Sequence, residues 1–275
     1  MGRGSIDYDR SMSRLTGRVV AVTGASAGIG RATAEHLARE GAAVALSARR
    51  ADRLDDIVSR ITSEGGRAVA VPGDVTIEAD MQRLVARAVE SFGHLDVMIC
   101  NAGIGYHDAF ERTPVSAMHR LVDVNLMGTF YAAQAALNVF LPRTTGHIIA
   151  VSSIVGRRGM GGSAVYSATK AAQIGFIEAL RAEFVGTGLH ASVVYPVRTE
   201  TEFHDAIHRD FGHRVVGLGP RQSADDVARA IVECVVSPKV EVYPFPKAWG
   251  LAVLSVVAPK WADRVVQKWG RRVER

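Results

Sequence analysis

The chain has 275 residues, of which 48% are hydrophobic and 22% charged, a balance that excludes a disordered chain and fits one sizeable α/β domain. The net charge is +5, and the whole excess lies from Lys239 onward, where 8 basic residues stand against 3 acidic ones. A nucleic-acid-binding surface would spread its positive charge over the fold, and no zinc-finger spacing is present, so we do not expect nucleic acid as a partner.

Residues 1–16 are polar, rich in Ser and Arg, and without the apolar run of a secretory signal, which predicts a flexible leader before the folded part. Two widely separated cysteines, Cys100 and Cys234, are too few for a disulfide framework. We therefore expect free thiols in a reducing, cytoplasmic compartment.

From Val19 onward, short β-branched runs alternate with longer amphipathic stretches, the pattern of βαβ units around a parallel sheet that is buried on both faces. The predicted strands are Val19–Thr23, Ala43–Ser47, Ala68–Val71, Val97–Cys100, His147–Ser152, Ser192–Tyr195 and Val240–Tyr243. The predicted helices are Gly28–Arg39, Arg53–Ser63, Ile77–Phe92, Val115–Leu141, Ala164–Val185 and Ser223–Val236. Seven strands separated mostly by helices predict a three-layer, doubly wound α/β fold whose ligand lies at the carboxyl ends of the strands.

A glycine-rich segment, Gly24 to Gly30, follows the first predicted strand and opens the first predicted helix. Glycines there permit a tight turn and let backbone N–H groups at a helix N-terminus approach a pyrophosphate. An ordinary turn is the alternative, but the strand before it and the helix after it favour a dinucleotide site.

In this turn the chain resembles the short-chain dehydrogenase/reductase family in its compact single-domain form, because three residues separate the first two glycines. The resemblance covers roughly Thr16 to Tyr243 and extends through Asp74-Val75, Asn101 to Gly105, Asn125, Ser153 and Tyr166 to Lys170. It implies a Rossmann fold over residues 17–245, with a seven-stranded, mostly parallel sheet, and an oxidoreductase that interconverts a carbonyl and a secondary alcohol by hydride transfer. The expected cofactor contacts are Gly24, Ser26, Ala27, Gly28, Ile29, Gly30, Arg49, Asp74, Val75, Asn101, Ala102, Gly103, Tyr166, Lys170, Pro196, Val197, Thr199 and Thr201.

The choice between NAD(H) and NADP(H) can be argued from charge. Ala48 stands where NAD-preferring relatives place a ribose-binding carboxylate, and the guanidinium of Arg49 can clamp the extra phosphate of NADP. These residues predict NADP(H), although Ala27 lacks the basic side chain that many NADP relatives carry in the glycine turn. The alternative is that Arg49 and Arg50 only form a solvated helix start.

The resemblance implies that Asp74 and Val75 border the adenine and that Asn101 to Gly103 lie under the cofactor. Asn101 and Asp74 also each have an interpretation that involves only the fold and no cofactor. The Asn101 side chain can pin neighbouring strands by hydrogen bonds, and Asp74 can cap a loop.

Tyr166 and Lys170 are four residues apart in a predicted helix, so both side chains share one helix face. A fixed ammonium favours a phenolate and lowers the pKa of a tyrosine from its usual value of about 10. The resemblance implies that Tyr166 protonates the carbonyl oxygen as hydride arrives, and that Lys170 also holds the nicotinamide ribose. Ser153 matches the family's oxyanion-stabilising serine, while Ser152 is expected to turn into the fold.

Asn125 lies in an otherwise apolar helix, where a buried amide is costly without partners. It is expected either to help hold a water that links Lys170 to solvent, or to be a satisfied helix kink. With Ser153 and Tyr166 it completes the expected catalytic tetrad. Val197 departs from the family, which usually has Gly at that position, and a β-branched residue restricts the backbone near the nicotinamide.

The stretch Thr199–Pro220 is the least regular part of the chain and is predicted to be an active-site flap. It contains His204, His208 and His213, but the glutamate of the hydrolytic zinc motif is missing, so no metal is expected. The apolar residues placed near the reacting centre favour a small hydrophobic ketone or alcohol as substrate, while Arg157 and Arg158 could meet an anionic group. These apolar residues are Ile154, Val155, Met160, Val197 and Phe203.

The C-terminal extension, residues 246–275, holds all three tryptophans of the chain, Trp249, Trp261 and Trp269. Its uncharged run Ala248–Ala258 is too short to span a bilayer, which needs about 20 residues. Further on, an apolar stripe recurs every fourth residue beside a basic one, which predicts an amphipathic helix. The apolar stripe is Trp261, Val265, Trp269 and Val273, and the basic stripe is Lys260, Arg264, Lys268 and Arg272. It is expected either to contact a membrane peripherally or to pack on the core or on a partner subunit.

The expected function is thus an NADP(H)-dependent oxidoreductase. A non-catalytic nucleotide-binding scaffold or redox sensor is one alternative, which the intact tetrad argues against. A same-fold epimerase or dehydratase is another, although those enzymes usually belong to the longer form of the family. The resemblance also implies a homodimer or homotetramer formed through the long helices before and after Ser153.

Overall fold

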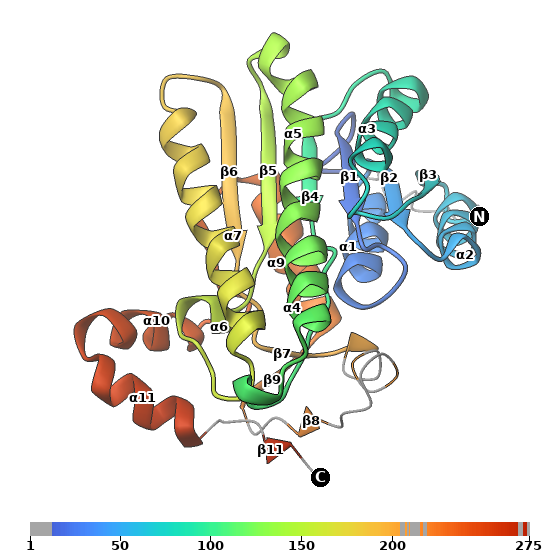
Figure 1. Ribbon diagram of the computed structural model, residues 1–275. Helices are drawn as coiled ribbons and strands as arrows, with labels where there is room; N and C mark the ends of the chain where they lie inside the picture. The colour runs from blue at the N-terminus through green and yellow to red at the C-terminus, as the bar shows by residue number, and fades with distance from the viewer. Residues whose placement is uncertain are drawn as a thin grey trace, which may run out of the picture.

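The computed structural model describes residues 13–203, 207, 209, 215–216, 219–268 and 272–273. Its centre is a seven-stranded parallel sheet in the order β10-β6-β5-β4-β1-β2-β3 (Figure 1). The strands are β1 Val19–Thr23, β2 Ala43–Ala48, β3 Arg67–Pro72, β4 Val97–Cys100, β5 Gly146–Val151, β6 Leu189–Val194 and β10 Glu241–Val242. The predicted doubly wound fold is confirmed, and the predicted strand ends shift by only a few residues.

Alternate residues of the strands face two different helix layers. Val19 and Ala21 pack with one layer, and Val20 and Val22 pack with the other. Because both faces are covered, the central strands are mostly apolar on both sides, and β1 and β4 are buried along their whole length. The first layer consists of α3 Glu78–Phe92, α5 Gly128–Phe140 and α7 Ala164–Glu183, and the second of α1 Gly28–Arg39, α2 Ala51–Ser63 and α9 Ala224–Val236.

The predicted single helix Val115–Leu141 is interrupted in the structure. Helix α4, Val115–Val122, leads into a π-helical turn, Asp123–Met127, and then into α5. Asn125 lies in this turn, where its backbone carbonyl is bonded by side chains instead of only by the helix ladder. The sequence prediction missed the turn because apolar periodicity continues across it.

The run Val115–Arg143 is long and apolar enough to cross a membrane, and it is the only such run in the described part of the chain. Small residues on its inner side, among them Ala132, Ala133 and Ala136, are fully buried in the core cluster of the first layer. Its apolar character is therefore used for packing on the sheet.

Several elements gather beyond the carboxyl edge of the sheet, at the lower end of Figure 1. Strand β7, Arg198–Glu200, pairs in parallel with β9, Arg221–Ser223, so the stretch predicted as an irregular flap contains strand structure. The short helix α6, Ile154–Arg157, and the C-terminal helices α10, Ala248–Val257, and α11, Pro259–Lys268, complete this end. Strand β8, Val215–Val216, pairs antiparallel with β11, Arg272–Val273.

The two cysteines are buried and unpaired, and they lie in opposite packing layers. His204, His208 and His213 lie outside the described residues. Among the residues that are described, no group of three His, Cys, Asp or Glu side chains is arranged to hold a metal ion.

Candidate active site

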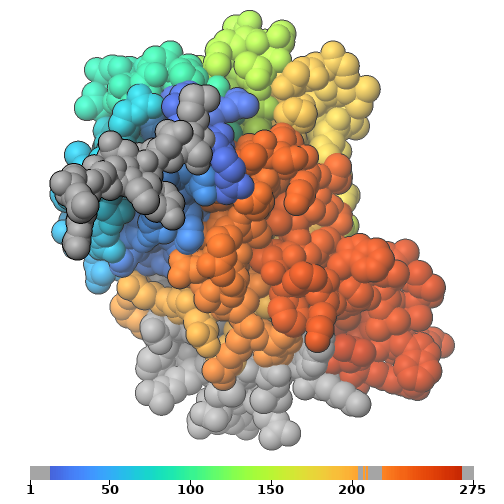
Figure 2. Space-filling view, turned by 180° about the vertical axis from the view of Figure 1, so that it is seen from behind, coloured from blue at the N-terminus to red at the C-terminus, as the bar shows by residue number. Residues whose placement is uncertain are grey.

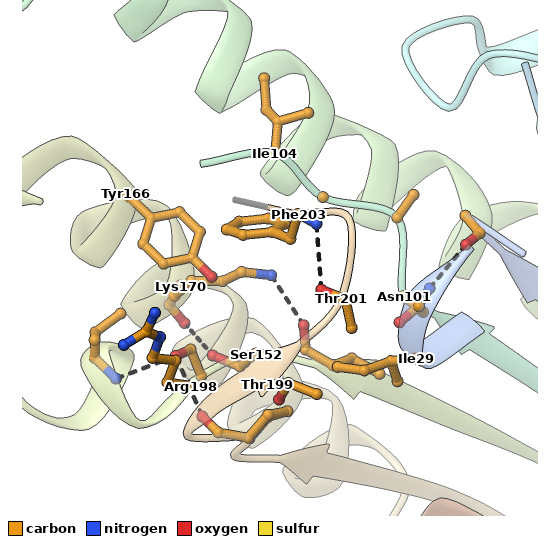
Figure 3. A pocket seen from close by; sticks show the side chains of 18 of the residues that line it. Ile29, Asn101, Ile104, Ser152, Tyr166, Lys170, Arg198, Thr199, Thr201 and Phe203 are labelled. Atoms are coloured by element: carbon orange, nitrogen blue, oxygen red, sulfur yellow. Dashed lines mark hydrogen bonds between the residues drawn. The ribbon is translucent and has the colours of Figure 1, made fainter. Parts of the chain in front are cut away.

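A cavity of about 370 Å³ opens at the carboxyl ends of β1, β4, β5 and β6 (Figure 3). The glycine turn after β1 lines one end of the cavity, and Tyr166 and Lys170 line the other. Every predicted cofactor contact except Gly30 lies on its wall, and every member of the predicted tetrad except Asn125 does so. The residues grouped by the sequence thus share one cavity, and Gly30 and Asn125 lie behind its wall.

Two positions of the glycine turn have no room for a side chain. A Cβ atom on Gly30 would lie 2.3 Å from the carbonyl oxygen of Gly24 and 2.5 Å from Nδ2 of Asn101. Gly24 has a φ of +66°, and a Cβ there would lie 2.7 Å from Cα of Ala102. Only glycine fits both positions, so the backbone of the turn is kept open toward the cavity.

Asn101 and Asp74 each combine both interpretations made from the sequence. Nδ2 of Asn101 donates to the carbonyl oxygens of Thr23, at 2.9 Å, and Gly24, at 3.2 Å, and so pins the end of β4 to the turn after β1. Oδ1 of Asp74 caps a loop by accepting from the backbone N–H and the hydroxyl of Thr76, both at 2.9 Å. Both residues nevertheless line the cavity.

Two arginines follow β2 and line the cavity beside the glycine turn. Arg49 is exposed, and within the described residues its side chain has no hydrogen bond or ion pair. Arg50 donates to Oγ of Ser26 and to a carboxylate oxygen of Glu202, both at 3.1 Å. Ala48 is buried at the end of the strand, so this position supplies no carboxylate, and the carboxylate that pairs with Arg50 comes from Glu202 on the cavity wall.

Tyr166 and Lys170 are buried on the same face of α7. Nζ of Lys170 lies 5.9 Å from the centre of the Tyr166 ring and donates to the carbonyl oxygen of Val151 at 2.9 Å. Burial lowers the pKa of Lys170 to about 7 in this cofactor-free protein. The ring centre of His107 lies 5.9 Å from that of Tyr166, and the ring centre of Phe203, seen in Figure 3, lies 6.0 Å from it.

Asn125 is held entirely by the protein. Its Oδ1 accepts from the N–H of Ile104 at 2.8 Å, and its Nδ2 donates to the carbonyl of Ile104 at 3.0 Å and to Oγ1 of Thr169 at 3.1 Å. The side chain therefore holds the segment after β4 in place. Its amide oxygen and nitrogen both have protein partners, as the helix-kink alternative expects.

Gln173 is a site residue that the sequence analysis missed. It is fully buried, its Oε1 accepts from Nζ of Lys170 at 3.1 Å, and its Nε2 donates to the carbonyl of Asn125 at 2.8 Å. Gln173 thus joins Lys170 directly to Asn125, and the expected water that links Lys170 to solvent stays a prediction. The available signal was a polar residue on the buried face of α7, three positions after Lys170.

The two neighbouring serines point in different directions. Ser152 turns into the fold and donates to the carbonyl of Lys170 at 2.8 Å. The hydroxyl of Ser153 contacts the carbonyl of Pro196 and the N–H of Val155, both at 3.4 Å, and caps α6 at the cavity wall. These long contacts leave Ser153 as the serine whose hydroxyl is available to a substrate oxygen.

The segment after β6 closes the cavity beside the glycine turn. Oγ1 of Thr199 donates to the carbonyl of Val197 at 3.0 Å and accepts from Gln222 at 3.2 Å, which ties β7 to β9. The methyl group of Thr201 lies 2.9 Å from where a Cβ of Gly28 would be. Val197 itself is buried in an apolar cluster with Tyr166, so its side chain occupies space that a glycine would leave open.

The end of the cavity nearest Tyr166 is mostly apolar, and all five predicted apolar residues line it. The sequence missed further apolar contributions from Ile104, from Phe245, and from Ala248 and Leu251 of the C-terminal extension. Arg158 also lines the cavity and forms an ion pair with Asp263 on α11. The expectation for Arg157 was wrong, because its guanidinium stacks 4.9 Å from the Tyr195 ring and pairs with carboxylates outside the cavity.

A parallel sheet whose carboxyl edge carries a glycine turn and a buried tyrosine–lysine pair defines a nucleotide-binding protein of the Rossmann class. Residues 18–211 match the family model described as short chain dehydrogenase, which covers most of the chain. The protein therefore belongs to the short-chain dehydrogenase/reductase family and is an oxidoreductase of that family.

Curated relatives agree with this assignment. An uncharacterized oxidoreductase of Listeria monocytogenes is 35% identical over 226 residues, which cover 79% of this chain and 91% of the relative. The ketoacyl reductase HetN of Nostoc is 30% identical over 262 residues, which cover 94% of this chain and 91% of HetN. The alignment with HetN thus extends over nearly the whole chain.

Solved structures show the same fold. A short-chain dehydrogenase/reductase from Burkholderia phymatum in complex with NAD superposes with a TM-score of 0.81 at 22% identity, covering 90% of this chain and 96% of that one. An alcohol dehydrogenase from Thermococcus sibiricus complexed with 5-hydroxy-NADP has a TM-score of 0.73 at 27% identity, covering 82% and 95%. Structural neighbours therefore include proteins with either type of dinucleotide.

Proposed function

We propose that this oxidoreductase uses NADP(H) to interconvert a carbonyl and a secondary alcohol on a small hydrophobic substrate, with Tyr166 as the acid and base. The observation that carries the proposal is the placement of Lys170 Nζ 5.9 Å from the Tyr166 ring centre, in the same cavity as the glycine turn. Neither feature alone specifies redox chemistry, but together they provide a dinucleotide cradle and a proton-transfer group.

The residues present fit a dinucleotide. The positions of Gly24 and Gly30 leave no space for a Cβ atom, so the backbone of the turn stays bare where a pyrophosphate would approach the first turn of α1. Asp74 and Val75 line the cavity where the adenine would lie, and Thr199 and Thr201 line it on the segment after β6, beside the glycine turn. The nicotinamide, when bound, supplies or accepts the hydride.

The protein's own residues handle the proton. An ammonium near a phenol favours the phenolate, so Lys170 makes Tyr166 a better proton donor and acceptor at neutral pH. Tyr166 gives its proton to the substrate oxygen during reduction and takes it back during oxidation. The hydroxyl of Ser153 donates a hydrogen bond to the charge that develops on that oxygen.

The preference for NADP(H) rests on the two arginines after β2. Positive charge at a helix N-terminus opposes the helix dipole, so Arg49 and Arg50 before α2 weaken the helix rather than support it. A phosphate between them would reverse that effect by forming charge-assisted hydrogen bonds. This argument favours a ligand role over a solvated helix start.

The hydrophobic substrate is supported by the apolar wall around Tyr166, to which α6, Phe203 and the C-terminal helix α10 contribute. The relative from Nostoc is described as a ketoacyl reductase, and the Thermococcus neighbour as an alcohol dehydrogenase. Both names fit carbonyl–alcohol chemistry, and an apolar cavity favours a ketone with a hydrocarbon body.

The test is the turnover of Tyr166→Phe on a panel of ketones and alcohols, followed by nicotinamide absorbance. We expect a loss of kcat of roughly 10²-fold to 10⁴-fold with unchanged NADPH affinity, because only the proton-transfer group is removed. Tyr131→Phe makes the same chemical change outside the cavity and should leave kcat unchanged. A wild-type protein that binds NADPH tightly but turns over no substrate would instead identify a scaffold or sensor.

A further inference from the structure

The C-terminal helices expose a concentrated apolar surface. Thirteen large hydrophobic side chains are exposed in the described part of the chain, and five of them lie between residues 249 and 261. We call these five the C-terminal apolar face: Trp249, Val253, Val256, Val257 and Trp261. The other eight are spread over residues 77–240, whereas these five lie within residues 249–261, and exposed apolar side chains that gather in one region mark an interaction site.

Helical spacing places the four residues of this face that belong to α10 on one side of that helix, while Trp261 belongs to α11. Trp249, Val253, Val256 and Val257 follow at intervals of four, three and one residues, which is one side of an α-helix. The opposite side of α10 carries Ala248 and Leu251, which are buried and line the active-site cavity. The helix is therefore a wall with the cavity on one side and the apolar face on the other.

Helix α11 holds this arrangement in place. Its buried residues are Ala262 and Val266, while Trp261 is 61% exposed. Within the apolar stripe predicted from the sequence, Val265 is half-buried and packs against the apolar cluster that contains Leu251, Trp261 is exposed, and Trp269 lies outside the described residues. Arg158 donates to the carbonyl of Pro259 at 3.1 Å and pairs with Asp263, so the two helices project from the body in a fixed position (Figure 1, Figure 2).

Cations border the apolar face. Lys247 and Lys260 are exposed at the beginnings of α10 and α11, and the guanidinium of Arg264 lies 4.8 Å from the ring centre of Trp261. The only acidic residue from 246 to 268 is Asp263, whose charge is balanced by Arg158. The surface therefore combines exposed tryptophan and valine with a net positive rim.

We propose that the C-terminal apolar face docks the protein on the surface of an anionic lipid bilayer. Helix α10 has 10 residues and is about 15 Å long, half the roughly 30 Å of a hydrocarbon core, so it lies in the interface instead of spanning it. Tryptophan is suited to the headgroup boundary, and the lysines and Arg264 meet lipid phosphates.

The same charges disfavour a second copy of this chain as the occupant. A two-fold symmetric contact through this face would bring two sets of the same cations, Lys247, Lys260 and Arg264, to one interface, and like charges across an interface are repulsive. The docking surface also does not depend on the proposed redox chemistry, so either proposal can fail while the other stands.

Intrinsic fluorescence offers a specific test, because all three tryptophans of the chain lie at residues 249–269. The full chain is mixed with phosphatidylcholine vesicles with and without about one-third phosphatidylglycerol. We expect sedimentation with the anionic vesicles, a blue-shifted emission and quenching by brominated lipid, with binding weakened by salt. Emission that stays unchanged, with the protein remaining in the supernatant, would overturn the proposal.

Matched variants connect binding to this surface. Val256→Ser should weaken vesicle binding about 10-fold, whereas Val185→Ser, at an equally exposed position after α7, should not change it (83% and 81% exposed). Lys260→Glu should weaken binding to anionic vesicles. Lys239→Glu should have little effect, because Lys239 is exposed just before β10, at the amino ends of the strands and away from α10 and α11.

Thermal unfolding of each variant shows whether the fold is kept, and Val256→Ser and Lys260→Glu test the surface independently of each other. The proposal is overturned if the Val185 and Val256 variants behave alike. It is also overturned if Val256→Ser instead dissociates a dimer of a protein that does not bind vesicles.

Discussion

Nζ of Lys170 donates a 3.1 Å hydrogen bond to Oε1 of Gln173, one helical turn further along α7. The other end of the same amide donates to the backbone carbonyl of Asn125 in the π-helical turn. The Gln173 side chain therefore connects Lys170 to the π-helical turn that contains Asn125. This connection gives Lys170 a fixed position before any cofactor binds.

Gln173→Leu should lower kcat about 10-fold, because it removes the acceptor that holds the ammonium near Tyr166 and leaves the Asn125 carbonyl with one partner fewer. Gln173→Glu retains an acceptor and adds a negative charge, which favours the charged lysine and should move the pH profile of kcat to higher pH. Identical pH profiles for wild type and both variants would contradict a positioning role for Gln173.

Lys170 should also make the stability of the cofactor-free protein depend on pH. Its folded pKa is lowered by burial to about 7, whereas an unfolded lysine titrates near 10.4. Between about pH 7 and pH 10 the unfolded chain binds a proton that the folded chain does not, so the free energy of unfolding contributed by Lys170 rises with pH, by at most about 1 kcal/mol per pH unit.

The comparison with Lys170→Met isolates this contribution, because methionine has a similar shape and does not titrate. Urea unfolding of both proteins at several pH values gives the difference in the free energy of unfolding. The wild type should gain relative to the variant from pH 7 to pH 10. A difference that is flat or falls over this range contradicts the lowered pKa.

Arg49→Ala should change the coenzyme preference. Losing a charge-assisted contact to the extra phosphate should raise the KM for NADPH about 10-fold and leave the KM for NADH little changed. Arg53→Ala removes an exposed arginine one turn into α2, outside the cavity, and serves as the matched control. A preference of the wild type for NADH would refute the argument from Arg49.

Two glycine substitutions should have opposite effects on stability. Gly30→Ala puts a Cβ atom 2.3 Å from the Gly24 carbonyl, so either the glycine turn shifts or the fold loses about 3 kcal/mol or more. Gly175→Ala lies in α7 with nothing within 4 Å and should stabilise the protein by up to about 1 kcal/mol. Denaturant unfolding of both variants checks the contrast, and equal effects would contradict the close packing of the turn.

The sequence by itself determined the features that depend on residues close together in the chain. Apolar runs and helical periodicity gave the order of strands and helices, because burial on both faces imposes that pattern locally. The segment from Gly24 to Gly30 marked the nucleotide end, and the spacing of Tyr166 and Lys170 put them on one helix face. Each of these inferences needs only the geometry of one strand, one turn or one helix.

Only the tertiary structure decided how distant segments meet. The contact of Gln173 with Asn125, the turning of Arg157 away from the cavity and the use of Leu251 as a cavity wall each join elements far apart in sequence. The tail shows the reason most clearly. Its apolar pattern predicted a helix, but the pattern did not decide which side of that helix would pack on the protein. Ala262 and Val266 are buried and Trp261 is exposed, because the shape of the protein surface under α11 selects the side that is covered.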